Sequence, residues 1–293
     1  MSNFWKRTGW FGLALTALVA SLVLQIIMGV IAVLPASLLA GMEAGRQGIT
    51  DVAEIEALIM EKSMGAASWG VLFYHLLSLP VFGLWYYFGC GRPKAVHPKK
   101  VFTVKSFLAV FVAGFGLCLV ANGIAMLLQY LTPNLFEQYM ELMESAGMGE
   151  NVVTIIAAVI LAPIGEEILC RGIVMHYARK MSAGIGSEKA SFWIANVLQA
   201  LLFGIMHGNF VQGTYAFILG MGLGILRHKF QSLYPAMLCH FAINFLSTYV
   251  MGYLFGWVPE NAFGTILVLV LGIAVTAVAG ILLKEKNEAQ VER

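Results

Sequence analysis

The sequence predicts an all-α membrane protein, built as a polytopic bundle of about eight transmembrane helices. Hydrophobic residues make up 59% of the 293 residues and charged residues only 12%, and the mean hydropathy is +0.81. A water-soluble domain carries roughly 25% charged residues. Only helices and closed barrels can span a bilayer, and the abundance of Leu, Ala, Ile and Met favours helices over a β-barrel.

Eight apolar stretches are candidates for membrane spans, since a helix needs about 20 apolar residues to cross a bilayer. The first follows Lys6 and Arg7, as the apolar part of a signal peptide would. Its length far exceeds the roughly 7–15 residues of a signal, so we expect a retained helix. The fifth and sixth stretches are short. The eight lie at 10–38, 66–89, 105–131, 152–178, 190–208, 211–227, 234–255 and 262–283.

Basic residues predict the orientation of these spans. Of the 18 Lys and Arg residues, only Arg46 and Lys62 fall in the loops on one side and Arg171 within a span. The rest lie in the termini and in the opposite loops, while most acidic residues share the side of Arg46. By the positive-inside rule, both termini are cytoplasmic. Compact loops, a short basic tail and the lack of targeting signals favour a bacterial inner membrane.

We expect three parts along the chain, with no internal repeat and no separate soluble domain. Residues 1–150 hold the N-terminal spans and outer loops, 151–250 form a core with the polar residues, and 251–293 hold the last span and a cytoplasmic tail. Within the outer loops, 49–60 and 134–143 place apolar side chains on one face, which predicts helices lying at the membrane surface.

Four cysteines show no paired or CxxC spacing. Three of them lie within or at the ends of apolar spans. We therefore expect small buried hydrophobic side chains rather than disulfides or zinc ligands. They are Cys90, Cys118, Cys170 and Cys239.

Polar residues interrupt the apolar pattern at three spans of the second half. Ionisable side chains inside a bilayer cost several kcal/mol, so they face the bundle interior and mark functional sites. A lone imidazole such as His75, in the second span, is interpreted as a hydrogen-bonding residue between helices. The interrupting residues are Glu166, Glu167 and Arg171 in the fourth span, Phe203 and His207 in the fifth, and His240 and Asn244 in the seventh.

The two adjacent glutamates are expected to have different roles. Glu167 and Arg171 are spaced i, i+4 and can form a buried ion pair. Glu166 lies about 100° further round the helix, so it cannot share Arg171 in the same geometry and stays a candidate reactive carboxylate. Pro163 should kink this span and free backbone groups near the site.

This set of side chains suits the hydrolysis of an amide by water. A carboxylate and an imidazole can hold and deprotonate a water, and a second imidazole with an amide can stabilise the oxyanion that develops on the attacked carbonyl. The motifs GxSxG, HExxH and GxxxxGK[ST] are absent. Serine-nucleophile, zincin and nucleotide-binding interpretations therefore lack their usual motifs.

The motifs EE-x3-R (166–171), F-x3-H (203–207) and H-x3-N (240–244) resemble the CAAX-protease and bacteriocin-processing family, also called CPBP or Abi. The resemblance covers roughly 150–250 and implies a bundle of about eight membrane helices around an intramembrane catalytic chamber. It implies that Glu166 and His207 activate water. It also implies that His240 and Asn244 form the oxyanion site, and that Glu167, Arg171 and Phe203 support the geometry.

The orientation of the spans places His240 near the cytoplasmic side and His207 near the opposite one. Both can line one site only if a span ends early. The fifth stretch is short and finishes at His207-Gly208-Asn209. We therefore expect this helix to stop part-way or to tilt strongly, with the chain breaking at Gly208.

The favoured function is an intramembrane endopeptidase without a cofactor. It would cut a membrane-associated peptide or lipidated protein near its C-terminus, with the lipid bilayer and that substrate as partners and no nucleic acid. A zinc enzyme using Glu166, His207 and His240 is the alternative chemistry. A non-enzymatic immunity or binding protein is the alternative function. A proton-coupled transporter is less favoured because neither half of the chain repeats the other.

Overall fold

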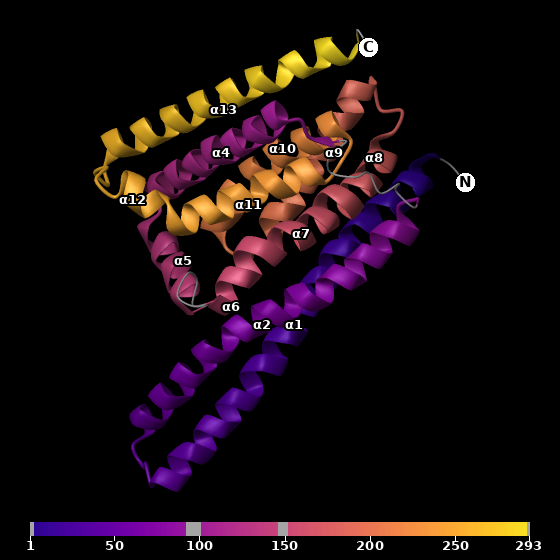
Figure 1. Cartoon of the computed structure of the whole chain (residues 1–293). Coiled ribbons are helices and arrows are strands. Elements are labelled where there is room, and N and C mark those ends of the chain that lie inside the picture. The colour runs from indigo at the N-terminus through magenta and orange to yellow at the C-terminus, as the bar shows by residue number, and fades with distance from the viewer. Residues whose placement is uncertain (1–2, 92–100, 146–151, 292–293) are drawn as a thin grey trace.

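The computed structural model describes residues 3–91, 101–145 and 152–291. Every regular element in these ranges is helical, as the sequence predicts, and the helices pack as one bundle with a long projecting hairpin (Figure 1). The first turn of α1 and the last turns of α13 lie near the same end of the bundle, as two cytoplasmic termini require. Some of the charged residues that the predicted topology places in loops or in the C-terminal tail lie outside the described residues. They are Arg92, Lys94, Lys99, Lys100, Glu150 and Arg293.

The N-terminal hairpin consists of α1 (Asn3–Gln47) and α2 (Val52–Gly89). At 1.5 Å per residue, the 45 residues of α1 span about 68 Å, roughly twice the hydrocarbon thickness of a bilayer. The C-terminal half of α1 and the N-terminal half of α2 extend beyond the other helices (Figure 1). Asp51 caps α2 by accepting hydrogen bonds from the N–H groups of Ala53 and Glu54.

One sequence prediction in this hairpin was wrong. Residues 52–60 do not form a separate helix at the membrane surface but are the first turns of α2. The helical interpretation of the segment was right. No residue between Val52 and Gly65 breaks a helix, so the amphipathic turns run directly into the apolar span. Pro80, further along, is accommodated inside α2.

Helices α4 (Val104–Leu131) and α13 (Ala262–Val291) lie side by side along one edge of the bundle (Figure 1). Their backbones approach closely at Gly116, where an added Cβ would lie 2.6 Å from the backbone nitrogen of Thr276. A separate short helix, α5 (Pro133–Ser145), confirms the helix expected at 134–143, and none of its residues is buried.

The fourth span is one continuous helical rod that alternates between α and π geometry. Its segments are α6 (Val152–Ile155), η1 (Ile156–Leu161), α7 (Ala162–Glu167), η2 (Ile168–Val174) and α8 (Met175–Ser182). Stretches of π-helix are rare and are frequently found at functional sites. Here they flank the segment that carries Pro163 and both adjacent glutamates.

Helices α9 (Glu188–Met206) and α10 (Phe210–Phe230) form the next hairpin. The chain turns at Gly208 with φ +70°, so the predicted break is confirmed. Two buried amides fasten the pair, since Asn196 donates to the carbonyl of Met221 and Gln199 to that of Gly220. These amides share a helical stripe with His207 but serve the packing of α9 on α10.

Seven helices of the described chain are long and apolar enough to cross a membrane, which makes this a multi-pass membrane protein. The expected span at 234–255 is instead divided into α11 (Tyr234–Tyr249) and α12 (Met251–Phe255). With 16 residues, α11 reaches about 24 Å, which is short of a full crossing. All four cysteines are free and buried, as predicted.

Two apolar cores hold the bundle together. One is formed mainly by α4, α10, α11 and α13, and the other by α1, α2, η2, α8 and α9. The polar residues singled out in the sequence lie where these two cores meet, on η2, α7, α9 and α11. The site is thus placed between two packed halves rather than at the surface of either.

Candidate active site

Glu167 is the centre of a buried ionic network. Its Oε1 accepts a hydrogen bond from Nη1 of Arg171 at 2.8 Å and one from Nδ1 of His240 at 2.9 Å. The side chains of Glu167 and Arg171 are both 0% exposed. The ion pair predicted from the i, i+4 spacing is confirmed, and the structure adds His240 to it.

Glu166 has a different environment from its neighbour. Its Oε2 lies 3.7 Å from Nε2 of His240, beyond direct hydrogen-bond distance, and its side chain is 15% exposed. The two ring nitrogens of His240 therefore face the two adjacent carboxylates. Because the Glu167 side chain is fully buried, with both donors on its Oε1, and Glu166 is partly exposed, Glu166 is the carboxylate that a water or a substrate can reach.

The ring of Phe203 contacts three ionisable side chains of the site. The guanidinium of Arg171 stacks on its face, with Cζ 4.3 Å from the ring centroid. The rings of His207 and His240 make T-shaped contacts with Phe203, at centroid distances of 4.9 and 5.8 Å and both at 83°. A cation over the ring face is a favourable electrostatic contact, and T-shaped ring pairs are a favoured geometry.

These contacts also bring His207 and His240 together. Each imidazole touches the same aromatic ring, although the sequence placed them toward opposite sides of the membrane. The early end of α9 at Met206 and the turn at Gly208 remove that conflict. The two histidines proposed for one site therefore do lie in one site.

The hydrogen bond of His207 determines its tautomer. Nδ1 lies 2.8 Å from the carbonyl oxygen of Phe203. Since a carbonyl can only accept, Nδ1 carries the hydrogen, and Nε2 of the neutral ring is left as an acceptor. His207 is half-buried, so this acceptor can serve a water held in the site.

The side-chain amide of Asn244 replaces a backbone hydrogen bond that Pro163 cannot make. In η1 the hydrogen bonds run from residue i to i−5, as the N–H of Ala162 donates to the carbonyl of Ala157. In that register the carbonyl of Ala158 would pair with residue 163, but proline has no N–H. Nδ2 of Asn244 donates to this carbonyl at 2.8 Å instead. The expectation that Pro163 frees backbone groups near the site is confirmed.

The structure also places a side chain that the sequence analysis interpreted as packing. His75 of α2 is buried, and its Nδ1 would lie 3.8 Å from a Cβ added at Gly165, the residue before Glu166. The signal that could have found it is the one that found the others, an ionisable residue in an apolar span. Because His75 is far from Glu166 along the chain, the sequence did not show that the two residues belong to one region.

The residues considered for zinc do not form a metal site in this arrangement. Among the described residues, no three His, Cys, Asp or Glu side chains are placed so that they could hold a metal ion together. The set of Glu166, His207 and His240 therefore does not fit a metal as it stands. The imidazole of His207 is oriented by its hydrogen bond to the Phe203 carbonyl, and that of His240 by its hydrogen bond to Glu167.

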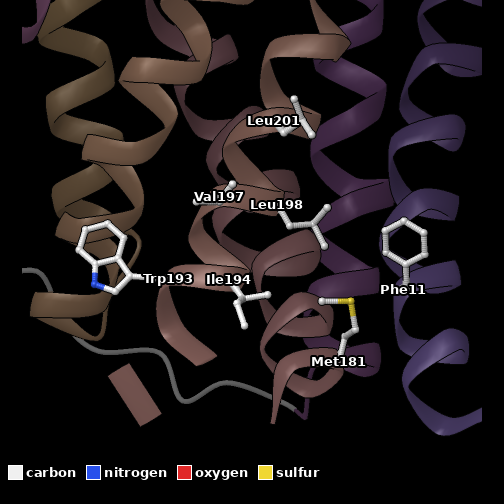
Figure 2. Close-up of a pocket in the computed structure, with 7 residues that line it drawn as sticks. All are labelled: Phe11, Met181, Trp193, Ile194, Val197, Leu198 and Leu201. Atoms are coloured by element: carbon white, nitrogen blue, oxygen red, sulfur yellow. The ribbon is translucent and has the colours of Figure 1, made fainter. Parts of the chain in front are cut away.

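An apolar groove of about 500 Å³ lies on another face of α9 (Figure 2). Leu201, in the groove, and Phe203, in the polar cluster, are about 200° apart around the helix. The groove is thus separate from the polar cluster and opens where lipid would contact the bundle. It is lined by Phe11 of α1, Met181 of α8 and, on α9, Trp193, Ile194, Val197, Leu198 and Leu201.

Fold and site together define a multi-pass membrane protein with a buried carboxylate–imidazole centre. Residues 148–246 match the family model described as type II CAAX prenyl endopeptidase Rce1-like. The matched region contains all three motifs and every residue of the cluster except His75. The match, which spans about a third of the chain, confirms the resemblance to the CAAX-protease (CPBP) family and supports a CAAX-type intramembrane endopeptidase in general. Searches of curated proteins and of solved structures returned no match.

Proposed function

We propose that this protein hydrolyses a peptide bond near the C-terminus of a membrane-associated peptide or protein, using water activated by Glu166 and His207 without a metal. The observation that carries the proposal is the difference between the adjacent glutamates. Glu167 is fully buried with two donors, whereas Glu166 is partly exposed and faces the imidazole of His240. A bacterial inner membrane is the proposed location.

In the first step, a water lies between Glu166 and His207. The carboxylate of Glu166 takes one proton from this water. Nε2 of His207 accepts a hydrogen bond from the other O–H of the water and so orients it. The oxygen then attacks the carbonyl carbon of the scissile amide. The Nδ1 hydrogen bond to the Phe203 carbonyl keeps His207 in the tautomer that this step needs.

The negative charge that develops on the carbonyl oxygen is stabilised by His240 and Asn244. Glu167 accepts a hydrogen bond from Nδ1 of His240, which orients the ring so that a proton on Nε2 can be donated to the oxyanion. One hydrogen of the Asn244 amide is engaged by Ala158, and the other remains for the oxyanion. Glu166 finally returns its proton to the leaving nitrogen as the C–N bond breaks.

For the substrate we propose a lipidated protein C-terminus. The matched family model is described as type II CAAX prenyl endopeptidase Rce1-like, and a site between membrane helices is reached most directly by a chain held at the membrane. The apolar groove beside α9 offers a place for a hydrocarbon chain on the lipid-facing side. A binding or immunity protein that reuses the fold remains the alternative function.

The test is cleavage of a peptide library with plain and prenylated C-termini by detergent-purified protein. Glu166→Gln should abolish cleavage, while Glu188→Gln, at an exposed ion pair with Arg179, should leave it unchanged. Activity should survive chelators, and the purified protein should contain no stoichiometric metal. Equal cleavage by wild type and Glu166→Gln would refute the assigned base. Absence of cleavage by the wild type would favour the binding protein.

A further inference from the structure

Helix α2 lies outside the region that matches the family model, yet it packs against the segment that carries the two glutamates. The contact is made at Gly165, the residue before Glu166. A Cβ at Gly165 would lie 3.4 Å from Oγ of Ser78 and 3.8 Å from Nδ1 of His75. The hairpin of α1 and α2, which the family model does not cover, therefore forms part of the wall of the candidate active site.

His75 is a buried imidazole with an unused hydrogen-bonding group. The residue is 5% exposed, and its Nδ1 makes no hydrogen bond within the described chain. Polar neighbours on the same helix are satisfied, since the Tyr74 hydroxyl pairs with that of Ser21 at 2.6 Å and Ser78 donates to a backbone carbonyl. A buried polar atom without a partner is costly, so an apolar side chain would serve packing better here.

The electrostatic surroundings of Glu166 show what His75 faces. Three helices bring an imidazole to this region: His240 on α11, with Nε2 3.7 Å from Oε2 of Glu166, His75 on α2, against the preceding Gly165, and His207 on α9, on the Phe203 ring that His240 also contacts. Further titratable or charged groups here are Tyr74 on α2 and Glu167, Cys170 and Arg171 on the helix of Glu166. Of the three imidazoles, His240 is held by Glu167 and His207 by the Phe203 carbonyl, which leaves His75 free to serve Glu166.

We propose that His75 is a positioning residue of the active site, whose ring N–H, unpaired in this structure, receives the carboxylate of Glu166 during the reaction and holds it toward the attacking water. This inference rests on the proposed function, because it assigns His75 a task only if Glu166 is the base. It makes the N-terminal hairpin part of the catalytic unit: the family core supplies the base and the oxyanion donors, and α2 supplies the group that orients the base.

The experiment compares His75→Phe, His75→Gln and Ser78→Ala in the cleavage assay across pH. Phe keeps a ring beside Tyr74 but removes the N–H, Gln keeps a donor, and Ser78→Ala alters the same helix face one turn away. His75→Phe should lower kcat about tenfold to 100-fold, the loss expected for one hydrogen bond to a charged group. KM should stay unchanged. The acid limb of the kcat/KM profile should also shift in His75→Phe, because this variant removes a hydrogen-bond donor to the group that takes the proton from water. His75→Gln should recover most of the rate.

An unchanged profile for His75→Phe, or equal loss in His75→Phe and His75→Gln, would overturn the inference and leave His75 a packing residue. Loss of cleavage in Glu166→Gln alone, with His75→Phe fully active, would overturn it while leaving the proposed function intact. Undiminished cleavage by Glu166→Gln would instead refute the proposed function.

A second measurement needs no turnover. The thermal midpoints of His75→Phe, Glu166→Gln and the double variant form a mutant cycle. Interacting side chains give a double variant whose shift differs from the sum of the single shifts. Additive shifts would overturn the placement of His75 against Glu166, even in a preparation that cleaves nothing.

Discussion

Replacing Glu167 by Gln removes one negative charge from the interior of the bundle and leaves the volume of the side chain almost unchanged. Two donors lose their charged acceptor at once, Nη1 of Arg171 and Nδ1 of His240. Arg171 is fully buried, so no solvent replaces the lost carboxylate. Breaking a buried ion pair by removing one partner costs about 3–5 kcal/mol, since the other charge is left uncompensated.

This cost translates into a measurable loss of thermal stability. For folded domains of 150–250 residues, 1 kcal/mol shifts the melting temperature by about 2–4 °C, so the drop should be on the order of 10 °C. The assay is thermal unfolding of the detergent-purified protein followed by intrinsic tryptophan fluorescence. Glu166→Gln is the matched control. Its carboxylate is partly exposed and 3.7 Å from its nearest imidazole nitrogen, so its melting temperature should change by about 2 °C or less.

A third variant separates the lost charge from other effects. Glu167→Gln combined with Arg171→Met removes the cation as well and keeps an unbranched side chain on the Phe203 ring. Replacing both members of a buried pair by uncharged groups is often neutral, so most of the stability should return. Equal melting temperatures for the two single variants, or no recovery in the double variant, would refute the assignment of Glu167 as the structural carboxylate.

Two further predictions concern the backbone. Pro163→Ala supplies the N–H that the Ala158 carbonyl lacks, which should displace the Asn244 amide and lower kcat with little change in stability. Pro35→Ala, in the far half of α1, is the control, and an unchanged kcat for Pro163→Ala would contradict the role of Asn244. Gly116→Ala places a Cβ 2.6 Å from the Thr276 nitrogen and should cost about 1–3 kcal/mol by forcing α13 away from α4. In a melting experiment Gly280→Ala, with no atom within 4 Å of its Cβ, should be neutral, and equal effects of the two would contradict the close crossing.

Features encoded by neighbouring residues were predictable. Apolar stretches of about 20 residues predicted membrane helices because the period and length of a span are local properties. The Glu167–Arg171 pair followed from a spacing of one helical turn. The turn at Gly208 followed from a short span ending in a glycine, the residue that adopts a positive φ without steric cost.

Features set between distant segments were not predictable in the same way. The amphipathic turns at 52–60 have the pattern of a surface helix, and only the structure shows that they continue into α2. The end of α11 at Tyr249 was hidden because an apolar run does not show where a helix stops. Periodicity tells which face of a helix is apolar, but not where that helix ends or which neighbour covers it.

The sequence by itself determined the class of the protein and the identity of the polar residues, because intramembrane carboxylates and imidazoles are conspicuous in an apolar chain. Only the tertiary structure decided their partners: His240 between the two glutamates, Asn244 on the Ala158 carbonyl, and His75 beside Gly165. The physical reason is that these contacts join residues 73 to 90 positions apart. Such contacts depend on how whole helices pack, which is set by the summed shapes of side chains along both cores.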